Sequence, residues 1–198
     1  HPWNWRGWWD YGTGALGDMA CHILHQPFRA LKLGYPTKVE GSSTLLLSAC
    51  APQAQHVKMI FPARDNMPKV ALPEVEVHWY DGGMMPDRPE GFPQGKELMG
   101  EGGGLCIFHG TKDTLICGCY GVNPWLLSGR KPNVPQTLRR VKDAMKGGHE
   151  QDWIRACKES AGSRVQTKSN FLEAGPFNEM VVMGVLAVRL QRLNKELL

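Results

Sequence analysis

The stretch DYGTGALGDMACHILH, residues 10–25, decides how the rest of the chain is interpreted. Its glycines, Gly12, Gly14 and Gly17, have the spacing G-x-G-x-x-G and run directly into a segment with helical periodicity. That spacing is typical of the loop that binds the pyrophosphate of a dinucleotide, provided that a buried strand precedes it. The neighbouring sequence therefore has to distinguish a nucleotide site from a tight turn into a helix.

Three features of that neighbouring sequence argue against the dinucleotide site. The preceding residues, HPWNWRGWWDY, contain Pro, Asn, Arg and Gly where an unbroken apolar strand is required. Asp18 follows the third glycine, where its carboxylate would repel a pyrophosphate at the helix N-terminus. Glu40 lies near the distance expected for the acidic residue that binds the ribose, but the strands after it lack the crossover helices of a parallel sheet. The glycines are therefore predicted to let the backbone turn tightly into the helix.

Outward from this stretch, the sequence predicts one helix, then strands, then helices. The first helix continues to Gly34, and Pro27 is expected to kink or split it. Three segments rich in Val, Ile and Thr are predicted to be extended: residues 37–50, 55–63 and 69–83. Residues 104–121 are expected to form a hairpin with its turn near Lys112 and Asp113. Three further helices are predicted: residues 135–146, 150–161 and 176–197.

This order indicates an α+β domain with a mainly antiparallel, open-faced sheet and helices packed on one face. At 198 residues, the chain is expected to form one domain, residues 1–198. Residues 1–12 form its Trp-rich arm, and residues 84–103 form a Pro- and Gly-rich loop of a length usually explained by function or disorder. The apolar run STLLLSAC, residues 43–50, favours a partner on the open face of the sheet.

Composition excludes several classes of protein. The chain has 42% hydrophobic and 21% charged residues, which is ordinary for a globular domain. Arg189 interrupts the longest apolar run, so we expect no membrane span. The excess positive charge lies mainly in residues 128–146, without interleaved aromatic residues, so we expect a solvated helix face and no nucleic-acid site. The six cysteines have no C-x-x-C pairs. Cys117 and Cys119 would share one face of a strand, with Cys106 across the predicted turn, which leaves open a cross-strand disulfide, but buried free thiols are preferred.

A second pattern in the opening stretch carries more information than the glycines. GALGDMACHILH resembles the motif G-x-L-x-D-x-x-x-H-x-x-D, which opens the C-terminal domain of the Gfo/Idh/MocA family of NAD(P)-dependent oxidoreductases. Asp18 and His22 match the family's active-site Asp and His, whereas His25 replaces its final Asp. The resemblance continues through LGYPTKVE, VEVHWYDGG and GPFNEMVVMGVLAVRL, although only the Asp/His motif is specific.

The resemblance implies a fold like the C-terminal domain of dihydrodipicolinate reductase and an activity on sugars, inositols or related polyols. It implies NAD or NADP in the full-length enzyme, and none bound by these residues, because the N-terminal Rossmann domain lies outside them. The expected partners are that Rossmann domain, a small sugar or polyol, and further copies of the chain that bind through the open sheet. The compartment is left open, since any export signal would lie in the N-terminal part.

The chemistry expected of Asp18 and His22 is acid/base catalysis. At positions i and i+4 of a helix the two side chains share a face, so the carboxylate can orient the imidazole. A histidine with a pKa near 6.5 can take a proton from a hydroxyl at neutral pH. The plainer alternative is that Asp18 caps the helix and His22 is a satisfied core residue. Asp18, His22 and His25 would also suit a metal face, but no fourth ligand is evident and we expect no metal.

Aromatic residues supply the remaining candidates for substrate binding. Trp5, with Arg6 and Tyr11 as polar partners, is expected either to stack on a sugar or to close over the core. His78 and Trp79 are further candidates, and strand alternation puts them on opposite faces of the sheet. Two other functions remain open: a non-catalytic carbohydrate-binding or assembly module, and an NAD-assisted glycoside hydrolase of the same family.

Overall fold

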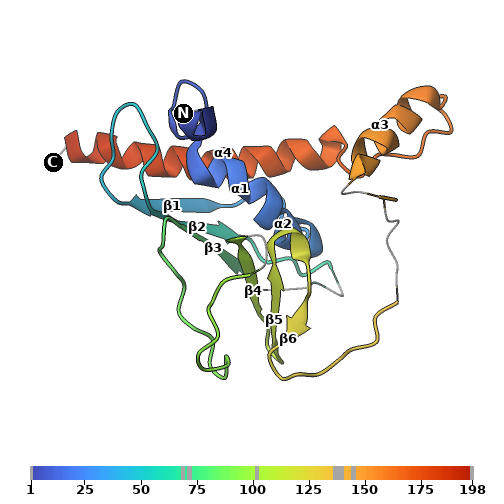
Figure 1. Ribbon diagram of the computed structural model, residues 1–198, viewed down its shortest axis with the longest axis horizontal. Helices are drawn as coiled ribbons and strands as arrows, with labels where there is room; N and C mark the ends of the chain where they lie inside the picture. The colour runs from blue at the N-terminus through green and yellow to red at the C-terminus, as the bar shows by residue number, and fades with distance from the viewer. Residues whose placement is uncertain are drawn as a thin grey trace. The chain divides into compact units, whose positions relative to one another are not determined.

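The computed structural model describes residues 2–67, 70, 73–100, 103–135, 141–143 and 146–196 (Figure 1). These residues form two small three-stranded antiparallel sheets and several helices. The chain divides into two compact units, His1–Lys131 with Phe177–Leu198, and Pro132–Pro176. The predicted α+β class and antiparallel pairing are confirmed, whereas the single domain stays a prediction.

The first sheet has the order β1-β2-β3, from β1 (Lys38–Ser43), β2 (Gln55–Phe61) and β3 (Val75–Asp81). Strand β2 alternates strictly between buried and half-buried side chains, as a period of two predicts. Val57 is paired with Trp79 across the antiparallel ladder, and both side chains face the core. The inner face of this sheet is therefore apolar.

The second sheet consists of β4 (Leu105–His109), β5 (Thr114–Gly118) and the short β6 (Trp125–Leu126). The predicted hairpin is confirmed, and its turn is closed by the Gly110 amide, which donates to the Asp113 carbonyl at 3.0 Å. The expectation of one continuous sheet was wrong. Within the described residues β3 pairs with β2 alone and β4 with β5 alone, and β3 and β4 line a cavity instead of pairing with each other.

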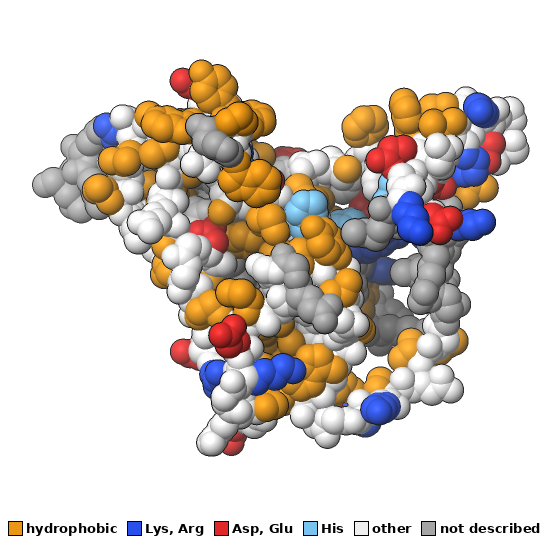
Figure 2. Space-filling view, in the orientation of Figure 1, with side chains coloured by type: hydrophobic (Ala, Val, Ile, Leu, Met, Phe, Trp, Pro, Cys, Tyr) orange, Lys and Arg blue, Asp and Glu red, His pale blue; other side chains and the backbone are white. Residues whose placement is uncertain are grey.

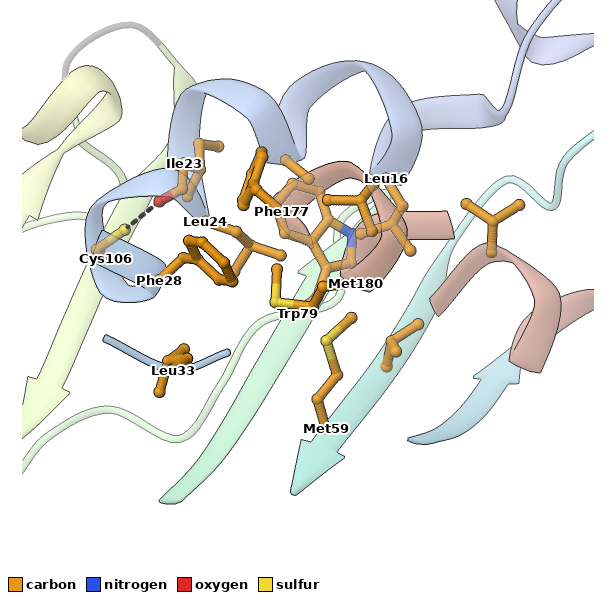
Figure 3. Packing of buried hydrophobic residues seen from close by; sticks show 14 of the residues in the cluster. Leu16, Ile23, Leu24, Phe28, Leu33, Met59, Trp79, Cys106, Phe177 and Met180 are labelled. Carbon is orange, nitrogen blue, oxygen red and sulfur yellow. Dashed lines mark hydrogen bonds between the residues drawn. The ribbon is translucent and has the colours of Figure 1, made fainter. Parts of the chain in front are cut away.

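The predicted first helix is split into α1 (Gly14–Ile23) and α2 (His25–Ala30). Pro27 has no N–H to donate to the carbonyl of Ile23, which lies four residues earlier. The thiol of Cys106 on β4 donates to that carbonyl instead, at 3.1 Å (Figure 3). The proline thus breaks the helix as expected, and a side chain from the second sheet satisfies the backbone group that it leaves unpaired.

Helix α4 (Phe171–Glu196) begins five residues before the expected Pro176. The apolar periodicity did not indicate this earlier start, but Asn170 could have. Its side-chain oxygen accepts a hydrogen bond from the Leu172 amide at 3.1 Å, as the side chain of an N-cap residue does. Figure 1 shows α1 and α4 covering the same face of the first sheet. The helix lies very close to that sheet at Gly41, where an added Cβ would come within 2.7 Å of the Val188 nitrogen.

The core forms where α1, α2 and α4 meet the inner face of the first sheet and the start of the second (Figure 3). The largest side chains that are almost completely buried come from α1, β2, β5 and α4: Phe61, Leu16, Met59, Ile116 and Met180. Trp79 is also buried, and its indole donates to the Asp81 carboxylate at 2.6 Å. Helices therefore pack against the sheets on the inner side, and the outer face of the first sheet stays open.

Helix α4 is also the helix that meets a length and composition test for crossing a membrane, over Phe171–Leu193 of the described chain. A third of the tested window is buried. Core helices of globular proteins pass the same test, and Phe177, Val185 and Val188 pack in the core cluster. We therefore describe α4 as a core helix.

The second unit contains α3 (Gly148–Lys158), which corresponds to the helix predicted over residues 150–161. Its Arg155 side chain donates to Asp152 at 3.3 Å and is also paired with Glu159. The helix predicted over residues 135–146 lies largely outside the described residues.

The first strand is shorter than predicted, whereas the described part of the 84–103 segment is a loop, as predicted. Residues 44–49, expected to continue the first strand, lie outside β1, and Leu45 and Leu47 are exposed there instead of lining an open sheet face. The described part of the 84–103 loop is irregular but held together, since both terminal nitrogens of Arg88 donate to the Lys96 carbonyl, at 3.0 and 2.8 Å. The apolar surface therefore lies on a loop, while the open sheet face is polar.

Candidate functional site

The Trp-rich arm forms a 3-10 helix, η1 (Pro2–Gly7), and a turn that leads into α1. Residues 44–54 anchor it, because the Trp9 amide donates to the Ala49 carbonyl at 2.9 Å and the Ala51 amide to the Gly7 carbonyl at 2.8 Å. Four of its aromatic side chains are at least half exposed: Trp3 70%, Trp5 54%, Trp8 50% and Tyr11 67%. Figure 2 shows hydrophobic side chains gathered at the surface over η1 and the start of α1.

Arg6 joins this arm to α1. Its guanidinium lies 4.1 Å from the centre of the Trp3 ring, a cation–π geometry, and is paired with the Asp18 carboxylate. Trp5 and Tyr11 meet edge to face with ring centres 6.5 Å apart. The structure thus brings Trp5, Arg6, Tyr11 and Asp18 together on one surface, which we call the arm surface.

Asp18 does not cap α1. The N-cap position is Thr13, and Asp18 lies in the second turn, where Arg6 engages its carboxylate. The expected role in orienting His22 has no direct contact to support it, because the hydrogen bond described for the Asp18 side chain goes to Arg6. Arg6 is therefore the residue that fixes the position of this carboxylate.

His22 follows one turn later and contacts a residue that the sequence did not single out. Its ring meets Tyr120 edge to face, with centres 5.1 Å apart. Tyr120 lies in the short 3-10 helix η3 (Cys119–Gly121) and has a φ of 62°, in the left-handed region that non-glycine residues rarely adopt. Such outliers concentrate at functional positions. The following Gly121 also has a positive φ, and this Tyr-Gly pair was the available sequence signal.

Two further side chains, Cys21 on α1 and His25 at the start of α2, contact residues of α4. His25 meets Phe177 edge to face at 5.2 Å, and Cys21 lies 4.0 Å from the Asn178 side-chain oxygen. Within the described part of the chain, no group of three or more His, Cys, Asp or Glu side chains is arranged to hold a metal ion. Burial and the nearby Asp18 charge raise the pKa of the Cys21 thiol, so the thiol stays protonated at neutral pH.

His78 and Trp79 lie on β3, away from the arm surface. Strand alternation separates them as predicted, since Trp79 is in the core and His78 is on the outer face. Both line a cavity of about 1260 Å³ that follows the free edges of β3 and β4, with Met19 and Ile23 of α1 on its wall. The structure therefore divides the predicted substrate residues between two places.

On the outer face of the first sheet, His78 belongs to a ladder of stacked rings. His56 stacks on His78 and on Tyr80, with ring centres 5.2 and 4.5 Å away. The Nε2 atom of His56 is 2.9 Å from the Nδ1 atom of His78, and Glu76 pairs with Lys58 at 2.7 Å. Burial, the facing His78 and the charge of Lys58 lower the pKa of His56. The hydrogen bond from Lys58, followed by that from His78, lowers the pKa of Glu76.

The glycines of the opening stretch contact the protein itself and leave no cradle for a phosphate. A Cβ added at Gly12 would lie 2.3 Å from the Arg6 carbonyl oxygen, and one at Gly17 would lie 1.7 Å from the Thr13 hydroxyl. Residues 2–7 before them form a 3-10 helix where a dinucleotide loop requires a strand. These residues do not fit a dinucleotide.

No protein-family model and no curated protein matches this sequence.

Proposed function

We propose that this chain is the substrate-binding and oligomerisation part of an NAD(P)-dependent oxidoreductase that acts on a sugar, an inositol or a related polyol. Its fold would then be a variant of the C-terminal domain of dihydrodipicolinate reductase-like proteins. The observation that carries the proposal is the pairing of Arg6 with Asp18, which draws an exposed aromatic arm onto the helix that presents His22. A cofactor domain outside these residues would supply the nicotinamide.

In this proposal, three residues of the arm surface act together with His22 and Tyr120. The half-buried His22 takes the proton from the reacting hydroxyl, since a neutral imidazole is a base of suitable strength at pH 7. Arg6 and Asp18 offer donors and acceptors to neighbouring hydroxyls, and the exposed ring of Trp5 packs against the C–H face of the sugar. Tyr120 holds the His22 ring from the side through their edge-to-face contact.

A fluorescence titration of this chain with a panel of sugars and polyols tests the binding part of the proposal. The exposed tryptophans should report binding, and Trp5→Ala should weaken it by tenfold or more. Trp153→Ala is the matched control, because Trp153 is similarly exposed, at 64%, but lies on α3. Equal effects of the two substitutions, or no binding by any sugar or polyol, would contradict a sugar site on the arm surface.

A second experiment tests the chemistry in the chain joined to its cofactor domain. His22→Ala should lower turnover by about 10² or more, as loss of a general base does. His109→Ala, an exposed histidine at the end of β4, should leave turnover unchanged. Calorimetric titration of the present chain with NAD+ and NADH should show no binding, and micromolar binding would contradict the separate cofactor domain.

A non-catalytic carbohydrate-binding module is the second candidate, favoured by the exposure of four aromatic side chains on one arm. In such a module Trp5→Ala abolishes sugar binding, whereas His22→Ala changes nothing. NAD-assisted glycoside hydrolysis by the same site is distinguished by its product, a released sugar without net reduction of the cofactor.

A further inference from the structure

We propose that the cavity between β3 and β4 binds an extended peptide segment of a partner protein, which alternates apolar and basic residues and adds a strand between the two sheets. This cavity of about 1260 Å³ is the one that His78 and Trp79 line, and we call it the edge cavity. Sites for small molecules measure about 300–1,000 Å³, so the edge cavity has room for several residues of a peptide. No residue of the arm surface lines it, so a bound peptide would leave the proposed sugar site free.

Two open strand edges form walls of the edge cavity. Every residue of β3 and every residue of β4 lines it. Successive side chains of a strand point to opposite faces, so a cavity that touches all of them lies against the edge of the strand. Within the described residues neither edge is paired with another strand. The walls therefore present unpaired backbone N–H and C=O groups to the cavity.

Neither edge is protected against pairing with a further strand. Natural proteins usually protect an open edge with proline, lysine or a covering segment. The sequences of β3, VEVHWYD, and β4, LCIFH, contain neither proline nor lysine. The loop between the strands does not pair with them either, because the backbone hydrogen bonds described for residues 85–100 join residues of that segment to each other.

An extended peptide is the occupant that suits two such edges. The backbone of a strand has donors and acceptors along both of its sides, and peptides add to exposed sheet edges through them. A small apolar molecule has few donors and acceptors. It would leave the backbone groups of both edges unpaired and shielded from water, which costs free energy.

The helices supply an apolar floor, which selects the side chains on one face of the peptide. Met19 and Ile23 of α1 and Pro27 of α2 line the edge cavity. Alternate side chains of an inserted strand would point toward these residues, and the others would point away from them. The inward positions of the peptide therefore favour apolar residues.

The charge of the edge cavity selects the outward positions. Among the described residues, Arg88 is the single lysine or arginine that lines the cavity, and its guanidinium donates to the Lys96 carbonyl. The acidic side chains that line it are Glu74, Glu76, Asp81, Asp87, Glu90 and Asp113. Asp87 and Glu90 form no ion pair within the described part of the chain. The chain as a whole has a net charge of +4, so this acidity is local and favours basic residues in the peptide.

Fluorescence anisotropy with synthetic peptides tests the occupant. The probe is a labelled peptide that alternates lysine and valine over seven residues, the length of β3, and it should bind saturably. Methyl groups on the backbone nitrogens of its valines keep the charge and side chains but remove donors to a strand edge, so they should weaken binding by about tenfold or more. Glutamate in place of every lysine should weaken it by a similar factor. Equal binding of the plain and methylated peptides, or binding of neither, overturns the proposal.

Variants of the protein test the location. Asp87→Lys combined with Glu90→Lys should weaken binding of the lysine peptide by about tenfold or more, because like charges then face each other. Glu97→Lys is the matched control, since Glu97 is exposed on the same loop but does not line the edge cavity. Circular dichroism should show that both variants are folded. An equal effect of the control and the double variant overturns the proposal.

Hydrogen exchange of the wild type tests whether a strand is added. The bound lysine peptide should slow the exchange of amides in both β3 and β4 and leave the amides of β1 unchanged. Peptide binding that protects neither β3 nor β4 contradicts an added strand. If the peptide does not bind and the wild type sediments at twice its mass of 22.1 kDa with both strands protected, the occupant is a second copy and the proposal is overturned.

Discussion

At the scale of single residues, one thiol satisfies a backbone group that a proline leaves unpaired. The Cys117 thiol and burial raise the pKa of Cys106 far above its ordinary value, so Cys106 keeps its proton and donates it to the Ile23 carbonyl. The described cysteines are all free, as preferred over a cross-strand disulfide, and Cys106, Cys117 and Cys119 are buried. The buried break between α1 and α2 thus depends on a contact from the other sheet.

We predict that Cys106→Ala costs about 1–3 kcal/mol of unfolding free energy, the usual cost of leaving a buried carbonyl without a donor. Cys106→Ser keeps a hydroxyl donor and should cost clearly less. Urea denaturation of both variants measures the difference. If the two substitutions cost the same, the bond between Cys106 and Ile23 contributes nothing to stability.

The ladder of stacked rings on the first sheet should make the stability of the folded protein depend on pH. The pKa of His56 is lowered in the folded protein, so the unfolded chain binds the proton more readily. Stability is therefore fully present above the ordinary histidine pKa of about 6.5 and is lost as pH falls below it. The contribution of Glu76, whose pKa is also lowered, is lost only at more acidic pH, below its own ordinary value.

Thermal denaturation between pH 7.5 and pH 5.5 measures this effect. The wild type should lose stability across this range, and His56→Gln should flatten the dependence whatever it does to the absolute stability. His109→Gln is the control, because His109 is exposed and lies on the other sheet. An unchanged slope in His56→Gln would assign the dependence to other groups.

At the scale of elements, the contact between α4 and the first sheet depends on two glycines whose surroundings differ. An alanine Cβ at Gly41 would meet backbone atoms of α4, 2.7 Å from the Val188 nitrogen. At Gly184 it would meet the ends of flexible side chains, 2.8 Å from Met59 Cε and 2.9 Å from Leu16 Cδ2. Backbone cannot move aside without displacing the helix, whereas a side-chain end can rotate.

We therefore predict that Gly41→Ala destabilises the protein more than Gly184→Ala, on the scale of about 1–3 kcal/mol for overpacking. Gly175→Ala, also in α4, meets no atom within 4 Å and should stabilise the helix by up to about 1 kcal/mol. Denaturant midpoints of the three variants give the order. The reverse order for Gly41 and Gly184 would show that α4 shifts easily on the sheet.

Most elements were predictable because local patterns determine them. The strict alternation of β2, the hairpin of β4 and β5, and the break at Pro27 each follow from a few adjacent residues. The arm surface was less predictable. Asp18 is matched by a motif, but its partner Arg6 lies twelve residues earlier and is brought there by backbone contacts with residues 49–51. Nothing in the spacing of Asp18 encodes that contact.

At the scale of the whole molecule, the difference between features set by adjacent residues and contacts between distant residues explains why one sheet was expected and two are present. Strand patterns identify the strands but not which edges pair, and the pairing of β3 with β4 would have to be set across the long connection between them. The boundary between the two compact units likewise falls at Pro176, inside α4. Pro176 removes the amide that would bond to the Leu172 carbonyl, so the helix is locally weaker where the units meet in sequence.

The attachment of the Trp-rich arm has a consequence for hydrogen exchange. The pair of Arg6 and Asp18 is about one third exposed on each side, and such pairs contribute little because water and salt screen them. The backbone bonds from Trp9 and Ala51 lie at the same attachment, so they should open together and well before the strands of the sheet. The exchange rates of the amides of residues 9 and 51 thus report how often the arm detaches. A sugar that bridges the arm to α1 would slow their exchange while leaving the exchange of the β2 amides unchanged.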